Sequence, residues 1–173
     1  VMNTDNMTIC GVTIDYGPCA FMDAYDPRTV FSSIDHMGRY AYANQPAIAQ
    51  WNLARLAETM LPLMDDENER AIDMAEKTVN GFGALYKEKS LSMMRGKLGL
   101  FGSQPEDENL ITDLLDWMQR QDADYTNTFL DLTEDGPPPG KLYDGEIFKE
   151  WHARWKARLA KNTKPMKSSL SLM

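Results

Sequence analysis

Hydrophobic residues recur with a helical period along most of the chain after Pro46. Pro46 itself suits the first turn of a helix, because proline lacks the N–H that a helix start leaves unbonded. Pro62 is expected to stop or kink this helix. Its apolar stripe, with spacings of four, three and four residues, consists of Ala49, Leu53, Leu56 and Met60.

Two more helices are predicted in the middle of the chain. Acidic residues at 65–69 favour the start of a helix, since they interact well with its N-terminal dipole. This helix runs to about Leu98, with a break near Gly81 and Gly83. Another helix is expected over residues 106–121, and its apolar face consists of Leu110, Leu114 and Met118, with Ile111 and Leu115 beside them.

The C-terminal third is predicted to hold two helices around a linker. A short helix covers residues 124–132, residues 134–140 (EDGPPPG) form the linker, and the last helix spans residues 145–160. The tail at 162–173 has no period and is expected to fray. One side of the last helix carries Phe148, Trp151, Trp155 and Leu159. Core packing is the favoured interpretation of this stripe, and a cofactor site is the alternative.

The head of the chain has a different pattern. Residues 7–16 (MTICGVTIDY) are rich in β-branched side chains and are predicted to form a strand or a tight hairpin interrupted at Gly11. Residues 17–45 have no clear period and indicate a long ordered loop, a kind of segment that often carries function. The fold class is therefore mainly α (α+β), a short β-hairpin and loop head followed by a helical body. The expected segments are a head at 1–45, a helical body at 46–133, a linker at 134–143, a final helix at 144–161 and a disordered tail at 162–173.

Composition and charge exclude several classes of function. The 173 residues carry a net charge of −8, so general attraction to nucleic acid or to an anionic membrane is not expected. No apolar run is long enough for a membrane span. Cys10 and Cys19 lack metal-site spacing and are expected to be reduced thiols, and His36 and His152 have no ligand partner at zinc spacing.

Candidate chemistry lies in the opening stretch, VMNTDNMTICGVTIDYGP. In protein kinases a catalytic aspartate precedes a metal-binding asparagine by five residues, and a D-F-G motif follows. If Asn6 is that asparagine, Val1 stands at the position of the catalytic aspartate, and Asp15-Tyr16-Gly17 resembles D-F-G. Asp5 then supplies a carboxylate beside the metal, while Asn6 and Asp15 supply oxygen ligands of the kind that Mg²⁺ prefers. The alternative is that both stretches are ordinary turns.

The same stretch closely resembles the selenoprotein O family, whose members are protein adenylyltransferases with a kinase-like fold. The likeness is nearly continuous over residues 1–63, with VMNTDN, DYGP and GRYAYANQP among the matching motifs, and it continues more loosely in KLGL and DYTNTFLDL. In the family, VMNTDN follows a His-Gly pair, so we expect this chain to be the C-terminal-lobe part of a longer protein. The Gly-rich segment and the Lys–Glu pair of the family's other lobe are not found here, nor is its C-terminal cysteine or selenocysteine.

This resemblance implies a pseudokinase that transfers AMP from ATP to Ser, Thr or Tyr hydroxyls of proteins. It makes Asp5 the catalytic proton acceptor, Asn6 and Asp15 the ligands of Mg²⁺ (with Mn²⁺ as the alternative), and Asp15 also a contact to ATP. The expected partners are ATP and protein substrates, with no nucleic acid and no membrane. The expected location is the bacterial cytoplasm, with the mitochondrion as the alternative. A non-catalytic helical binding fragment and a divergent protein kinase remain as alternatives, and this fragment alone is expected to be inactive.

Overall fold

The structure is a computed structural model that describes residues 1–12, 21–134, 136 and 138–162. Its residues group into two compact units, and each is described here by itself. The first unit comprises Val1–Phe21 and Pro27–Glu88, and the second comprises Met22–Asp26 and Lys89–Met173. No helix in the described part of the chain combines the length and the apolar character that a membrane crossing requires.

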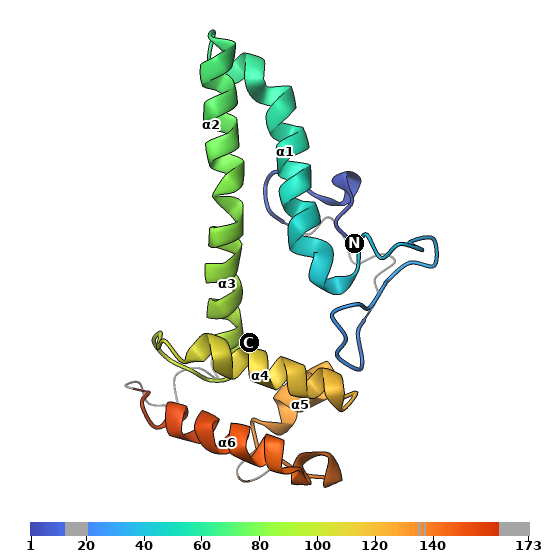
Figure 1. The fold of residues 1–173 in the computed structure, drawn as a ribbon, viewed down its shortest axis with the longest axis vertical. Coiled ribbons are helices and arrows are strands. Elements are labelled where there is room, and N and C mark those ends of the chain that lie inside the picture. Colours follow the sequence, from blue (N-terminus) through green and yellow to red (C-terminus); the bar gives the residue numbers. More distant parts are fainter. Residues whose placement is uncertain (13–20, 135, 137, 163–173) are drawn as a thin grey trace. The chain divides into compact units, whose positions relative to one another are not determined.

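The first unit is built around a pair of helices, α1 (Gln45–Met64) and α2 (Asn68–Asn80), which lie side by side and run in opposite directions (Figure 1). Small side chains let the two backbones approach closely, because Ala49 of α1 and Ala71 and Ala75 of α2 are all buried. The Gln50 side chain donates a hydrogen bond of 3.1 Å to the Val79 carbonyl across the pair. Two short 3-10 helices, η1 (Thr4–Asn6) and η2 (Tyr42–Asn44), also belong to this unit.

The helix predicted after Pro46 is confirmed, but only part of its predicted apolar stripe is buried. Leu56 and Met60 remain 37% and 38% exposed, whereas Ala49 and the polar Asn52 are buried. Periodicity identifies which residues share a face, and the partner elements decide how much of that face is covered. Pro62 lies in the last turn of α1, which ends two residues later at Met64.

The predicted break near Gly81 is also confirmed. The N–H of Gly81 bonds to the carbonyls of Lys77 and Thr78, which closes the last turn of α2. The next helix, α3 (Phe82–Lys97), starts at the following residue, and the boundary between the two units falls within it. Gly83 lies inside α3 rather than at a break.

The second unit contains the hydrophobic core. Its elements are the end of α3, α4 (Asp107–Arg120), α5 (Tyr125–Asp131), η3 (Lys141–Asp144) and α6 (Glu146–Leu159), with α4 and α6 packed together (Figure 1). Leu110, Leu114 and Met118 of α4 are buried as predicted.

The tryptophan stripe of the last helix is part of this core, as the favoured interpretation predicted. Trp151 and Trp155 are 1% and 4% exposed, and their rings stack with centroids 5.9 Å apart. Both indole N–H groups are satisfied, because Trp151 donates to the Leu110 carbonyl at 2.8 Å and Trp155 to the Leu98 carbonyl at 3.0 Å. These bonds remove the cost of burying the indole nitrogens and tie α6 to α4 and to the end of α3.

The β-hairpin predicted for the head is not seen in the described residues. Residues 7–12 form turns, with the Gly11 N–H bonded to the Thr8 carbonyl at 3.2 Å and a φ of 71° at Gly11, and residues 13–16 lie outside the described part. The β pairing found there is an isolated antiparallel bridge between Ala24 and Asp124 in the second unit. β-branched residues favour a strand only when a partner strand can pack against them, so local composition alone misled the prediction.

Candidate functional site

The NTDN segment, residues 3–6, folds into a single 3-10 turn. The Asn6 N–H bonds to the Asn3 carbonyl at 3.1 Å, and the Asn6 side-chain amide donates to the Val1 carbonyl at 2.8 Å. Asp5 and Asn6 are both exposed, so this turn presents a carboxylate and an amide oxygen to solvent from neighbouring positions.

Helix α1 anchors this turn through two polar side chains. Gln45 accepts a hydrogen bond from the Met2 N–H at 2.8 Å, and Asn52 donates one to the Met2 carbonyl at 2.7 Å. Gln45 and Asn52 are seven residues apart, which places them on one face of α1. The peptide groups on both sides of Met2 are therefore held by one helix, three residues before Asp5.

Each anchoring side chain is itself restrained. Gln45 also donates from its amide nitrogen to the carbonyls of Tyr40 and Ala41, which fixes the orientation of the amide group. Asn52 is 6% exposed, and it contacts the Met7 sulfur as well as Met2. Asn52 thus touches the chain on both sides of the NTDN turn, and the turn is positioned by a helix rather than by a loop.

Two buried amide oxygens beside this turn have no hydrogen-bond donor within the described residues. They are the Oδ1 atoms of Asn3 and Asn52. A buried acceptor without a donor is costly, so such atoms usually face a water molecule or a group that the structure does not contain. The surroundings of the NTDN turn therefore have unused capacity to accept hydrogen bonds.

Two of the three predicted site residues lie in the part of the chain that the structure describes. Asp5 and Asn6 are adjacent in the turn, and Asp15 lies outside the described residues, so its distance from Asn6 stays a prediction. Within the described part of the chain, no three or more His, Cys, Asp or Glu residues form a metal-binding cluster. The donors that the turn does supply are hard oxygens, which fit Mg²⁺ rather than zinc.

Cys10 lies in the same segment and is exposed with a free thiol. Its sulfur and the Thr8 hydroxyl are 2.7 Å apart in a hydrogen bond. This bond lowers the pKa of the Cys10 thiol below its usual value. Cys19 falls among the undescribed residues, so the expectation of two reduced thiols stays a prediction.

The loop between the NTDN turn and α1 is braced internally. Both carboxylate oxygens of Asp35 accept backbone N–H groups, from Arg39 at 2.9 Å and from Tyr40 at 2.8 Å. The Tyr42 N–H bonds to the Thr29 carbonyl at 2.9 Å, which ties the end of the loop to its beginning. Asp35 is therefore a structural residue of a turn.

Sequence reasoning missed Gln45 and Asn52. Both lie in QPAIAQWN, a stretch in which apolar spacing drew attention to Ala49 and Leu53 instead. The available signal was a pair of amide side chains seven residues apart on the face that also carries the buried Ala49. Amides on a buried face need partners, and here the partner is backbone about fifty residues earlier in the chain.

Comparison with known proteins agrees with the resemblance noted in the sequence. The family model described as "Protein adenylyltransferase SelO" matches residues 1–169. The chain is 61% identical over its whole length to the "Protein nucleotidyltransferase YdiU" of Alcanivorax borkumensis and 62% identical to that of Nitrosococcus oceani. It is 53% identical to the protein of the same name in Bacillus cytotoxicus.

The chain spans 36% of the length of the Alcanivorax relative and 35% of the other two. These relatives come from bacteria and give no support to the mitochondrial alternative. The family match extends through both units, from the NTDN turn to the end of α6. This chain belongs to the SelO family.

Proposed function

We propose that this chain carries the proton-accepting and metal-binding part of a Mg²⁺-dependent protein adenylyltransferase of the bacterial cytoplasm. The observation that carries the proposal is the NTDN turn, in which Asp5 and Asn6 are exposed neighbours just after Met2, whose backbone α1 holds. The family match and the names of the relatives support a nucleotidyltransferase.

In this reaction a Ser, Thr or Tyr hydroxyl oxygen of the acceptor protein forms a bond to the α-phosphorus of ATP. The bond from that phosphorus to the oxygen bridging the α- and β-phosphates breaks, and pyrophosphate leaves. Asp5 accepts the hydroxyl proton as the new bond forms, a role suited to an exposed carboxylate.

Asn6 and Asp15 would hold the metal through an amide oxygen and a carboxylate oxygen. The ion would supply positive charge that offsets the triphosphate in a chain whose own net charge is −8. The amide nitrogen of Asn6 is bonded to the Val1 carbonyl, so its Oδ1 atom is the one left to act as a ligand.

The relatives are about three times the length of this chain, so we expect the remaining polypeptide to complete the nucleotide site. Because phosphoryl-group chemistry depends on positioning and charge stabilisation, the 173 residues alone should transfer little AMP. A non-catalytic binding fragment is the alternative for the isolated chain, and a divergent protein kinase is the alternative for the full-length protein.

The test uses the full-length protein with ATP labelled at either the α- or the γ-phosphate. We expect the α-label on protein, and Asp5→Asn should reduce that transfer by about 10²–10⁴-fold. Asp73→Asn, an exposed aspartate of α2 in the same unit, is the matched control and should transfer at the normal rate. Transfer of the γ-label instead would establish a kinase.

A second arm separates the metal ligands from the proton acceptor. Asp15→Ala should abolish Mg²⁺-dependent ATP binding, whereas Asp5→Asn should lower turnover and leave binding nearly intact. Equal loss of ATP binding in the two variants would contradict these assigned roles.

A further inference from the structure

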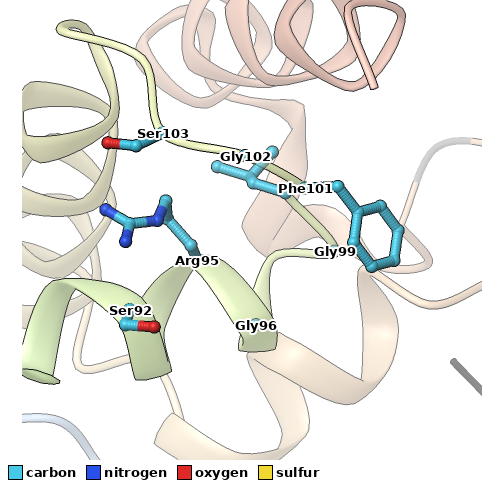
Figure 2. Close-up of a pocket in the computed structure, with 8 residues that line it drawn as sticks. Ser92, Arg95, Gly96, Gly99, Phe101, Gly102 and Ser103 are labelled. Atoms are coloured by element: carbon cyan, nitrogen blue, oxygen red, sulfur yellow. The ribbon is translucent and has the colours of Figure 1, made fainter. Parts of the chain in front are cut away.

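A pocket of about 480 Å³ lies in the second unit, between the C-terminal end of α3 and the loop that leads to α4. Its lining consists of Ser92, Arg95, Gly96, Gly99, Leu100, Phe101, Gly102 and Ser103. Arg95 is the only charged residue of these eight, and the other polar side chains are two serines. In the view of Figure 2 the Arg95 guanidinium lies between the side chains of Ser103 and Ser92, while the Phe101 ring points away.

The charge of Arg95 has no direct counterion in the described residues. Asp107 is near enough to feel this charge, but both of its carboxylate oxygens are already occupied. Oδ1 accepts from Arg158 Nε at 2.6 Å, and Oδ2 accepts from Arg158 Nη2 at 3.2 Å and from the Gln104 N–H at 3.0 Å. Arg158 therefore neutralises Asp107, and the half-buried Arg95 keeps a full positive charge with guanidinium N–H groups to spare.

Three other basic side chains of the second unit contrast with Arg95, because each has a partner. Arg154 pairs with Asp113 at 2.8 Å, Lys161 pairs with Glu106 at 2.6 Å, and Lys97 lies over the rings of Tyr125 and Phe129. A basic group that lines a pocket without such a partner is suited to receive an anion from elsewhere.

The loop that forms the opposite wall is fixed in place before any ligand arrives. Arg158 Nη2 donates to the carbonyls of Phe101 and Gly102, each at 3.2 Å, and Asn162 bonds to the Phe101 N–H at 3.0 Å and to the Gly99 carbonyl at 2.8 Å. These contacts hold the carbonyls on the side of Arg158. The N–H groups of Gly102 and Ser103, like the hydroxyls of Ser92 and Ser103, find no partner in the part of the chain that the structure describes.

From this arrangement we propose that the Arg95 pocket binds a compact oxyanion, a phosphate or a carboxylate group. The guanidinium supplies the charge and a planar set of donors, and the hydroxyls of Ser92 and Ser103 are the neutral side-chain donors among the lining residues. The C-terminal end of α3 carries partial negative charge, so the attraction has to come from Arg95 itself. Two sources can provide this chemistry, a free phosphate-bearing ligand or a carboxylate from the remainder of the full-length protein.

The first arm titrates inorganic phosphate into the 173-residue chain and follows the Arg95 Nε–H and the amides of Gly102 and Ser103 by NMR. We expect saturable shifts that sodium chloride at equal ionic strength does not reproduce. Arg95→Gln should weaken phosphate binding at least about tenfold, whereas Arg154→Gln, which removes a charge at an exposed ion pair, should bind phosphate normally. The amide spectrum of each variant reports whether the fold is intact.

NMR chemical-shift changes that sodium chloride also produces, or that persist in Arg95→Gln, would overturn the proposal. No nucleotide is present in this assay, so its outcome is independent of the proposed adenylyltransferase activity.

The second arm repeats the measurement in the full-length protein and distinguishes the two sources. Phosphate binding there that depends on Arg95 indicates a free ligand. If phosphate does not bind, the Tm values of the Arg95→Gln variant decide. An internal carboxylate is indicated when this substitution lowers the Tm of the full-length protein but leaves the Tm of the 173-residue chain unchanged. No phosphate binding and no change in Tm in the full-length protein would overturn the site.

Discussion

The two units of this chain differ in what they bury. Leu114 and Met118 in the second unit are completely buried, and tryptophans, phenylalanines and leucines surround them. In the described part of the first unit, the buried apolar residues are Ala41, Ala49, Ala71 and Ala75. Large apolar side chains of that unit are instead exposed, including Ile9 at 89%, Ile34 at 84%, Met37 at 93% and Leu63 at 83%.

The candidate catalytic residues and the hydrophobic core therefore lie in different units of this chain. Burying a large apolar side chain stabilises a fold by about 1.5–3 kcal/mol, so a unit whose buried apolar residues are alanines gains little from them. The first unit, which carries Asp5 and Asn6, relies on hydrogen bonds from α1 to shape its turn. We expect the additional polypeptide of a full-length relative to cover its exposed apolar residues.

The largest expected effect is the loss of the buried ion pair in the second unit. Asp107 and Arg158 each have side chains only 2% exposed and are 2.6 Å apart. Asp107→Ala leaves a buried guanidinium without its carboxylate and should lower the free energy of unfolding by about 3–5 kcal/mol, measured by urea denaturation. Asp113→Ala removes an exposed partner of Arg154 and should cost less than about 1 kcal/mol.

The same ion pair predicts a dependence on acid pH. Burial raises the pKa of Asp107, but the hydrogen bonds from Arg158 and from the Gln104 N–H outweigh it, and the net pKa lies below its usual value. A carboxylate with a lowered pKa in the folded state contributes stability above its unfolded pKa and loses it as the pH falls through the folded pKa. The urea concentration at the unfolding midpoint should therefore decrease as the pH is lowered below about 4 in the normal chain. The decrease should be smaller in Asp107→Ala.

The next effect concerns the first unit and is measured as activity of the full-length protein. Asn52→Ala removes the side chain that holds the Met2 carbonyl, so the carboxylate of Asp5 should be less well placed. A misplaced catalytic group can cost about 10²-fold, and we expect AMP transfer to decrease by up to that factor. Its matched control is Gln50→Ala, an amide on the same helix that bonds to Val79 of α2 rather than to the turn.

If the role of Asn52 were purely structural, Asn52→Ala would change Tm and would not lower kcat relative to the affinity for Mg²⁺–ATP. Equal loss of transfer in Asn52→Ala and Gln50→Ala, at equal loss of Tm, would contradict a positioning role.

A smaller effect is expected at Tyr143 in the second unit. Its hydroxyl donates to Asp131 at 2.5 Å, and Tyr143→Phe should lower the free energy of unfolding by about 1.5–3 kcal/mol, because the bond involves a charged acceptor. Burial, together with this bond, raises the pKa of Tyr143 to about 12. The unfolded tyrosine loses its proton near pH 10, so stability should fall as the pH rises from about 10 to 12. Tyr143→Phe should show a shallower decrease over the same range.

The smallest effect is the loss of a helix cap. The Asp124 side chain accepts the Asn127 N–H at 2.7 Å at the start of α5. Asp124→Ala should cost about 1 kcal/mol in thermal or urea unfolding. Asp124→Asn keeps an acceptor at this position and should restore most of the stability, whereas equal loss in both variants would show that charge rather than capping matters.

Much of the helical content could be predicted from the sequence. The stripe of Leu110, Leu114 and Met118 lies in the core, the break falls at Gly81, and the Trp151 and Trp155 face is buried. Each of these depends on residues within a few turns of one another, so local periodicity and glycine placement suffice. The β-branched run at 7–16 failed as a predictor in its described part, because strand formation depends on a partner.

Some features of the candidate site could likewise be predicted from the sequence, and others were visible only in the tertiary structure. The sequence by itself determined the helical periods and the adjacent Asp5 and Asn6 donors, because these are properties of neighbouring residues. Only the tertiary structure showed that Asn52 holds Met2, fifty residues away. It also showed that Arg158 neutralises Asp107, 51 residues away, which leaves Arg95 without a direct counterion among the residues that the structure describes. Hydrogen bonds and ion pairs act over a few ångströms in space, and separation along the chain does not reveal which groups the fold will bring that close.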